Sequence, residues 1–124
     1  MKKYSIISLV IAVLGLSACR NDNEQDLYNN TACDTSATTY SGFIVPLLAN
    51  ECYQCHNTAN FNSSGGGVQL EGYDNLIDYV NDGSFIGSIK HEGGFAAMPQ
   101  GSAKLDACSI SRIETWINNG ALNN

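Results

Sequence analysis

The chain has 124 residues, of which twelve are acidic, six are basic and two are histidines, so its formal net charge is −6. This length suits one small domain and leaves no room for a second. An acidic surface repels nucleic acid, which argues against a nucleic-acid-binding protein. It keeps a domain soluble, and it also favours protein partners with a basic docking surface.

The first 18 residues have the pattern of an export signal. Two lysines precede an apolar run of 11 residues, Ile6 to Leu16, which suits a signal peptide and is too short to span a bilayer. Leu16 to Cys19 are similar to the lipobox of bacterial lipoproteins, in which the cysteine becomes the lipidated first residue. We therefore expect residues 1–18 to be a lipoprotein signal peptide and Cys19 to carry the membrane anchor, with ordinary secretory cleavage as the alternative.

Residues 19–32 are rich in Asp, Glu and Asn and contain almost no apolar side chains. Such a segment buries too little apolar surface to offset the entropy lost on ordering. We expect a flexible tether, which would span on the order of 20 Å. It would hold a domain of residues 33–124 away from a membrane on the periplasmic or cell-surface side.

A helical pattern begins at Tyr40. Ser41 is a candidate N-cap, and the start can lie as late as Val45, because Pro46 is tolerated only in the first turn. The apolar residues of this segment have helical spacing and build one face: Phe43, Ile44, Leu47 and Leu48.

The sequence Cys52-Tyr53-Gln54-Cys55-His56 follows this helix directly. Positions i, i+3 and i+4 share one helix face, so both thiols can reach the vinyl groups of one haem while the imidazole binds its iron. We expect one covalent haem c, with thioethers at Cys52 and Cys55 and with His56 as the proximal ligand. A thioredoxin-like dithiol should follow a strand, and a zinc site would need a second close pair of ligands, so both alternatives fit less well.

The middle of the chain carries no second motif. Residues 57–67 predict a polar loop, and their glycine run lacks the Lys-Ser or Lys-Thr of a phosphate-binding loop. Two short helices are predicted next, one over 73–80 and one around 85–89. Asp74 and Asp78, four residues apart, indicate a solvated helix face rather than a catalytic carboxylate pair.

Met98 is the only methionine after the predicted signal peptide, and it lies in a Gly-rich segment followed by Pro99. Methionine is usually core filler, but in a loop its thioether could approach a haem iron from the side opposite His56. We expect Met98 to be the distal iron ligand. The rival is His91, the only other histidine, whose simpler role is that of a surface residue. Ligation by His and Met raises the reduction potential relative to ligation by two histidines.

The last helix is predicted to begin after Asp106, a candidate N-cap, and to end before Gly120. Its apolar face consists of Ile110, Ile113, Trp116 and Ile117. Alternating apolar and polar residues are scarce throughout the chain, so we expect an all-α fold.

The cysteine count predicts one disulfide. If Cys19 carries lipid and the motif cysteines carry haem, Cys33 and Cys108 remain for each other, and an exported protein can form disulfides. Closing a loop of about 75 residues would stabilise the fold by up to about 4 to 5 kcal/mol. The alternative is two separate buried or reactive thiols.

The order of these features resembles class I cytochrome c. The Cys-x-x-Cys-His motif near the end of the first helix, Met98-Pro99 about forty residues later and the final helix with Trp116 to Ala121 cover roughly residues 41–121. The chain looks like the small cytochrome c domains of bacterial lipoproteins. This resemblance implies about four short helices around one haem, with the first and last helices crossing.

The resemblance further implies that Gly42 or Phe43 meets the face of Trp116, and that Cys33 lies near Cys108. One departure concerns His56. In many members a proline soon after the haem histidine provides the carbonyl that accepts its ring N–H, but the only prolines here are Pro46 and Pro99. The acceptor for His56 therefore stays unassigned.

These features predict a membrane-anchored, monomeric, mono-haem cytochrome that passes single electrons between extracytoplasmic redox proteins and is not an enzyme. The alternative is a haem-based sensor or small-molecule binding domain with a displaceable sixth ligand. A peroxidase-like activity comes third, because no distal acid–base pair stands out.

Overall fold

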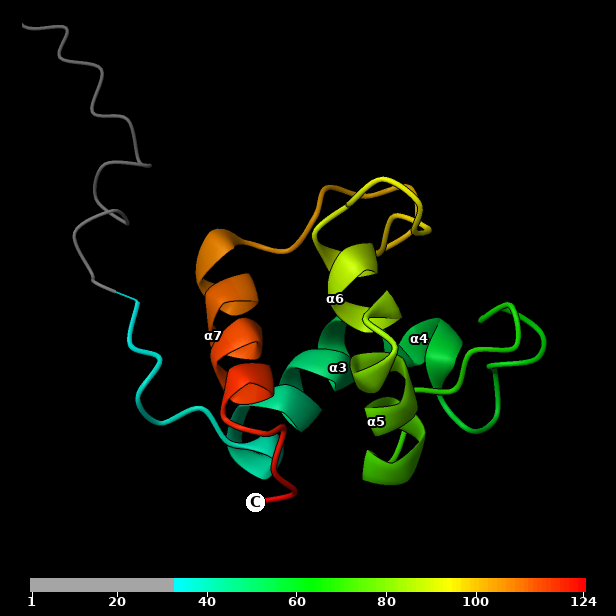
Figure 1. Cartoon of the computed structure of the whole chain (residues 1–124). Coiled ribbons are helices and arrows are strands. Elements are labelled where there is room, and N and C mark those ends of the chain that lie inside the picture. The colour runs from blue at the N-terminus through cyan, green and yellow to red at the C-terminus, as the bar shows by residue number, and fades with distance from the viewer. Residues whose placement is uncertain (1–32) are drawn as a thin grey trace, which may run out of the picture. The chain divides into compact units, whose positions relative to one another are not determined.

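The structure is a computed structural model that describes residues 33–124. The expected signal peptide 1–18, the lipidation site Cys19 and the tether 19–32 lie outside the described residues. Within residues 33–124 the chain forms helices and loops and no strand (Figure 1), which confirms the all-α prediction. No helix in this range is long and apolar enough to cross a membrane.

The helices follow one another closely at the start of the domain. A π-helical turn, η1 (Tyr40–Ile44), leads into α3 (Val45–Glu51) and α4 (Tyr53–His56). The later helices are α5 (Tyr73–Asn81), α6 (Ser84–Ile89) and α7 (Ala107–Asn118). The structure has more helical elements than the expected four, because η1, α3 and α4 together take the place of the first predicted helix. The break between α3 and α4 is at Cys52, whose φ of −125° departs from helical geometry.

The first helical segment starts earlier than its proline suggests. The side chain of Thr39 accepts a hydrogen bond from the N–H of Gly42 at 3.0 Å, so the prediction of Ser41 as the N-cap is wrong. The chain then makes a wide π turn before α3 begins at Val45, with Pro46 in the first turn of that helix, as its missing N–H requires.

Three aromatic residues from distant parts of the chain pack together at the centre of the core. The ring of Tyr40 stacks on Trp116 of α7 with a centroid distance of 6.0 Å, and meets the edge of Tyr73 at 5.2 Å. One turn earlier on α7, Arg112 lies over the ring of Phe43 at 3.6 Å. The remaining buried apolar residues are Ile44, Leu48, Leu70, Leu76, Val80, Phe85, Ile89, Ile110, Ile113 and Ala121.

The two ends of α7 lie where the sequence predicted them. Asp106 caps its start by accepting the N–H of Ser109 at 2.9 Å, and Gly120 leaves its end with a positive φ of 92°. The sulfur atoms of Cys33 and Cys108 lie 2.02 Å apart, across a separation of 75 residues. This disulfide agrees with the pairing expected from the cysteine count, and it ties the first described residue to the start of α7.

Candidate functional site

The motif thiols and His56 lie on one helical turn. The N–H groups of Cys55 and His56 donate to the carbonyl of Cys52 at 3.1 and 3.0 Å, so the i, i+3 and i+4 side chains share one face of the turn, as predicted. All three side chains line the same cavity, which has a volume of about 740 Å³. This volume is typical of a site for a small molecule or cofactor.

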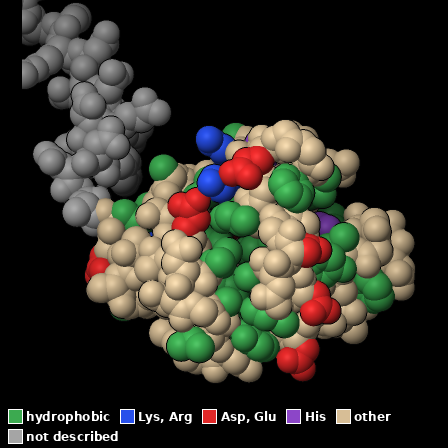
Figure 2. Space-filling view, viewed as in Figure 1, with side chains coloured by type: hydrophobic (Ala, Val, Ile, Leu, Met, Phe, Trp, Pro, Cys, Tyr) green, Lys and Arg blue, Asp and Glu red, His purple; other side chains and the backbone are tan. Residues whose placement is uncertain are grey.

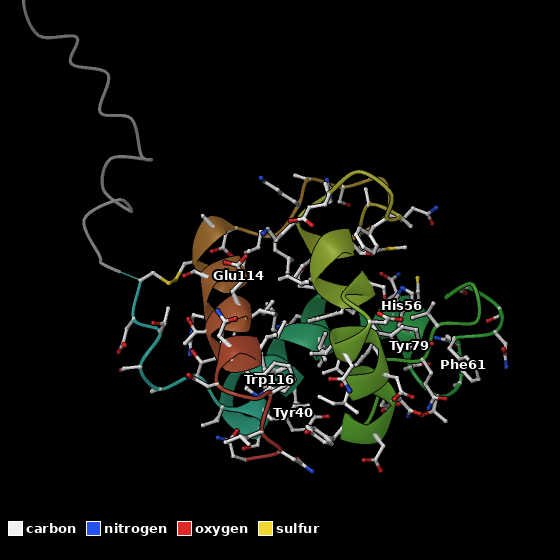
Figure 3. All side chains as sticks on the ribbon, viewed as in Figure 1. Tyr40, His56, Phe61, Tyr79, Glu114 and Trp116 are labelled. Atoms are coloured by element: carbon white, nitrogen blue, oxygen red, sulfur yellow. A yellow bond between two sulfur atoms is a disulfide. The ribbon has the colours of Figure 1, made fainter. Side chains whose placement is uncertain are left out.

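Five segments line this cavity. They are the helical segment from Glu51 to His56, the end of the 57–70 loop, the end of α5, α6 and the loop from 94 to 102. Figure 3 shows His56 on α4 beside α5, which contributes Tyr79. Most of the lining is apolar and includes Val68, Leu70, Tyr79, Phe85, Ile89, Phe95, Ala96, Met98 and Pro99.

His56 is held by a backbone acceptor. The side chain is buried, and its Nδ1 lies 2.9 Å from the carbonyl oxygen of Val68. A carbonyl can only accept, so Nδ1 carries the hydrogen and Nε2 is left with its lone pair. Nε2 has no hydrogen-bond partner among residues 33–124. Every buried side-chain nitrogen or oxygen in that range has a partner, so Nε2 is not itself a buried atom. Nε2 is therefore open to the cavity.

The acceptor that the sequence left unassigned is thus Val68. The N–H of Leu70 also donates to the carbonyl of His56 at 2.9 Å, so residues 68–70 run along the motif and are bonded to it at two points. A backbone partner of this kind fixes the ring orientation of a metal-binding histidine.

The glycine run 65–67 explains how the loop returns to the motif. A Cβ on Gly65 would lie 2.7 Å from the carbonyl oxygen of Cys55 and 2.9 Å from Cα of Phe61, so no larger residue fits there. Gly66 and Gly67 adopt positive φ angles of 61° and 85°, which favour glycine. The glycines therefore allow a close backbone approach that brings Val68 to His56.

The Cys52 thiol is poorly suited to nucleophilic chemistry. Burial, together with the charge of Glu51, raises its pKa to about 11, whereas a redox-active dithiol needs a lowered pKa. Within residues 33–124, no three His, Cys, Asp or Glu side chains lie close enough to hold a metal ion. A closed zinc site therefore has no ligand set in this part of the chain.

The two candidates for a second axial ligand lie in different environments. Met98 is partly buried and lines the cavity with Cys52, Cys55 and His56. His91 is exposed and is not part of the lining, and its Nε2 lies 3.0 Å from the backbone carbonyl of Met98. The structure therefore brings Met98, and not His91, to the cavity that contains the motif.

Phe95 covers α6 at the edge of this cavity. A Cβ on Gly87 would lie 2.3 to 2.7 Å from three carbons of the Phe95 ring, so the ring lies directly on the helix backbone. Phe95 is 40% exposed and lines the cavity. Phe95 is thus a cavity residue that the sequence did not single out, and Gly87 provides the space for its ring. A glycine within a short helix gives no signal of its own.

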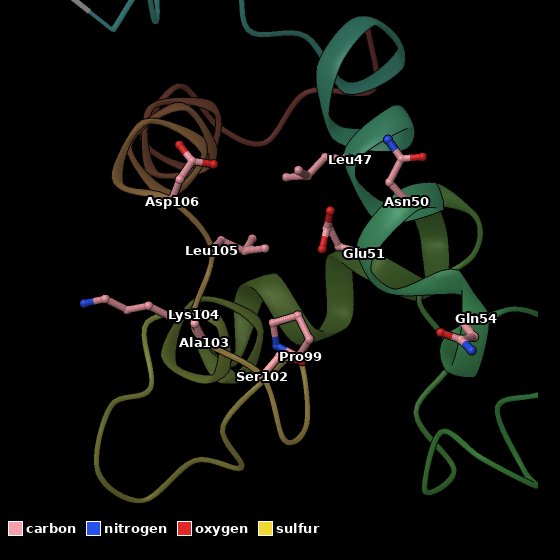
Figure 4. A pocket seen from close by; sticks show the side chains of 10 residues that line it. All are labelled: Leu47, Asn50, Glu51, Gln54, Pro99, Ser102, Ala103, Lys104, Leu105 and Asp106. Carbon is pink, nitrogen blue, oxygen red and sulfur yellow. The ribbon is translucent and has the colours of Figure 1, made fainter. Parts of the chain in front are cut away.

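A smaller and more polar cavity of about 390 Å³ adjoins the first. It lies between α3 and the segment 99–106, and Figure 4 shows Leu47 and Leu105 pointing into it from the two sides. Glu51, Gln54, Pro99 and Ser102 border both cavities. Asp74 and Asp78 border neither of them, in keeping with a solvated helix face.

The chain matches no known family model, no curated protein and no solved structure. Its resemblance to class I cytochrome c therefore rests on the order of its motifs.

Proposed function

We propose that this protein is a mono-haem c-type cytochrome of the class I type that carries single electrons. The observation that supports this best is that Cys52, Cys55, His56 and Met98 line one largely apolar cavity of about 740 Å³. Two thiols for covalent attachment, an imidazole and a thioether are the side chains that such a haem requires. When bound, the haem would supply the Fe(III)/Fe(II) couple.

Each site residue has a role that its surroundings support. Cys52 and Cys55 would form the thioethers, and the neutral state of the buried Cys52 thiol is compatible with that role. His56 would bind the iron through Nε2, since Nδ1 is engaged by Val68 at 2.9 Å. Met98 would be the sixth ligand. An iron with both axial positions filled suits electron transfer and leaves no position for a substrate.

The charges around the cavity favour a basic redox partner. Glu51 and Asp82 border the cavity, and no Lys or Arg among residues 33–124 does so. Lys90 is occupied by Glu92 and Glu114, each at 2.9 Å, and Arg112 lies on Phe43. Figure 2 shows acidic side chains spread over one face of the domain and basic side chains gathered near one edge. A partner with Lys and Arg around its own redox centre would associate faster with such a surface.

Export, the lipid at Cys19 and the tether 19–32 are part of the same proposal and rest on the sequence. A monomeric domain held on a tether of this length could reorient between a donor and an acceptor in the extracytoplasmic space.

Visible spectroscopy of the exported protein tests the axial ligands. Oxidised wild-type protein should show the weak far-red band of a sulfur-to-iron bond, and Met98→Ala should lose this band while its haem stays attached. Ser102→Ala, which changes another residue of the cavity lining, should keep the band. A wild-type protein without the band, whose reduced form readily binds carbon monoxide, would instead favour the haem-based sensor.

A further inference from the structure

We infer that His91 is a positioning residue for Met98, and that its ring holds the Met98 backbone in place instead of competing for the iron. The inference rests on the proposed function, because it names the residue that presents the sixth ligand. It is supported by three hydrogen bonds at the end of α6 and by the backbone conformation of His91.

The first two hydrogen bonds converge on one carbonyl. The oxygen of Ser88, in the last turn of α6, accepts the N–H of His91 and the N–H of Met98, both at 3.1 Å. Residues 90–97 therefore leave the helix and return to the same point. Ser88 thus fixes the N–H of Met98 relative to α6.

The third hydrogen bond fixes the other side of the same residue. Nε2 of His91 lies 3.0 Å from the carbonyl oxygen of Met98, and a carbonyl can only accept, so Nε2 donates. Both backbone polar groups of Met98 are then bonded to the short segment from Ser88 to His91. Because Nε2 carries a hydrogen in this arrangement, it has no lone pair for a metal.

The conformation of His91 makes this contact possible. Its φ is 57°, in the left-handed region where histidine, asparagine and aspartate are the residues most often found besides glycine. This conformation reverses the chain after α6, so that the His91 ring meets the Met98 carbonyl seven residues later.

Little else in the loop would hold Met98. Residues 91–97 are all exposed. Besides the bonds above, this segment is held to α6 by the N–H of Glu92, which donates to the carbonyl of Gly87 at 2.9 Å, and by the Phe95 ring, which lies against Gly87. Exposed segments with few buried contacts open easily. Loss of the His91 hydrogen bond should therefore free the Met98 carbonyl and weaken the hold of its thioether on the iron.

Two substitutions of His91 separate its hydrogen bond from its other properties. In His91→Gln the side-chain amide can place a donor at nearly the position of Nε2. In His91→Asn the donor lies closer to the backbone and falls short of the Met98 carbonyl, while asparagine tolerates the left-handed conformation at least as well. Glu92→Gln, which disturbs only the surface ion pair with Lys90, is the control.

The experiment is a titration of the oxidised, haem-containing full-length protein with imidazole, followed by loss of the far-red band. His91→Asn should bind imidazole roughly 2- to 10-fold more tightly than wild type, the range expected for the loss of one neutral hydrogen bond. His91→Gln and Glu92→Gln should stay within about twofold of wild type.

The outcomes distinguish this inference from the proposed function. A wild-type protein with the far-red band and an unchanged His91→Asn would overturn the role of His91 alone. A wild-type protein whose spectrum indicates ligation by two histidines, and changes in every His91 variant, would make His91 the ligand. A wild-type protein without attached haem would overturn the proposed function as well.

If His91→Asn does not fold, a measurement on the wild-type protein alone still tests the inference. In the reduced protein, nitrogen NMR should find the hydrogen of the His91 ring on Nε2, with a coupling across the hydrogen bond to the carbonyl carbon of Met98. A ring with its hydrogen on Nδ1 and no such coupling would overturn the inference.

Discussion

Cys52 is a motif residue whose ionisation depends on the fold. Cys52 is partly buried between α3 and α4 and lines the cavity. Burial is the main cause that raises its pKa to about 11, with Glu51 adding a smaller effect. At neutral pH the thiol therefore keeps its hydrogen. A thiol of this kind exchanges disulfides poorly. The raised pKa therefore fits a cysteine kept for haem attachment better than one of a redox-active dithiol.

We predict that Cys52 of the haem-free protein reacts slowly with iodoacetamide. At pH 8 its rate should be on the order of 100-fold below that of a free cysteine, since a pKa raised by about two units leaves that much less thiolate. The rate should rise steeply toward pH 11. Because unfolded Cys52 would ionise near pH 9, the haem-free fold should also lose stability as the pH rises from about 9 to 11.

The variant Cys55→Ser leaves Cys52 as the reporter in this assay, and circular dichroism shows whether the sample is folded. Unfolding in urea should restore the rate of a free cysteine. A folded Cys55→Ser protein that already reacts at that rate at pH 8 would contradict the assigned burial.

The partner of His56 illustrates what a sequence can predict at this scale. The residues of the motif are recognisable because their spacing carries the chemistry. The acceptor is a backbone carbonyl, which every residue possesses, so Val68 has no signature in the sequence. Its position follows from the path of the loop, which depends on the close approach at Gly65.

At the scale of elements, α7 supports the site without lining it. Trp116 packs on Tyr40, and Lys90 after α6 reaches Glu114 on α7 at 2.9 Å. The start of α7 is fixed by the Asp106 cap next to the disulfide at Cys108. A helix that holds both α6 and the first helical segment keeps the walls of the cavity together.

We predict that Asp106→Ala destabilises the domain by about 1 kcal/mol, the usual cost of a lost N-cap, as measured by urea unfolding at pH 7. Hydrogen bonds from Ser109 lower the pKa of the Asp106 carboxyl. Its charged form therefore stabilises the fold above about pH 4, the unfolded value, and this contribution is lost as the pH falls through the lower folded value.

Asp106→Ser is the matched control, since a serine cap keeps the hydrogen bond without a carboxyl group. Its free energy of unfolding should be close to that of wild type at pH 7. It should lack the loss of stability that protonation of Asp106 causes in wild type at low pH. Equal stability of Asp106→Ala and wild type at pH 7 would contradict the role of this cap.

The elements themselves were largely predictable. The helical spacing after residue 41, the helices over 73–80 and 85–89 and the last helix with its cap all correspond to helices of the structure. The π turn of η1 and the break at Cys52 were not predicted, because the spacing of apolar residues does not distinguish a π turn or a short break from a continuous α-helix. The backbone of Ser41 and the carbonyl of Asn124 meet at 2.8 Å, a pairing of the two ends of the domain that no local pattern encodes.

At the scale of the molecule, five segments with little in common in the sequence line one cavity. The all-α architecture and the Cys33–Cys108 pair followed from composition and cysteine count. The cavity could not be predicted in its details, since Val68 and Phe95 reach it through loop paths that depend on the whole fold. Its largely apolar lining and its single turn with two thiols and an imidazole are what the proposal of a covalent haem depends on.

The mass of the intact protein, exported from a bacterium that attaches haem, tests this central claim most directly. We predict that the denatured wild-type chain is heavier by one haem, and that a Cys52→Ser, Cys55→Ser double variant is not. Loss of the added mass in the double variant would tie the haem to these two sulfurs. A control cytochrome produced in the same cells should acquire its haem. If it does and the wild-type chain carries no haem on Cys52 and Cys55, the proposal is contradicted.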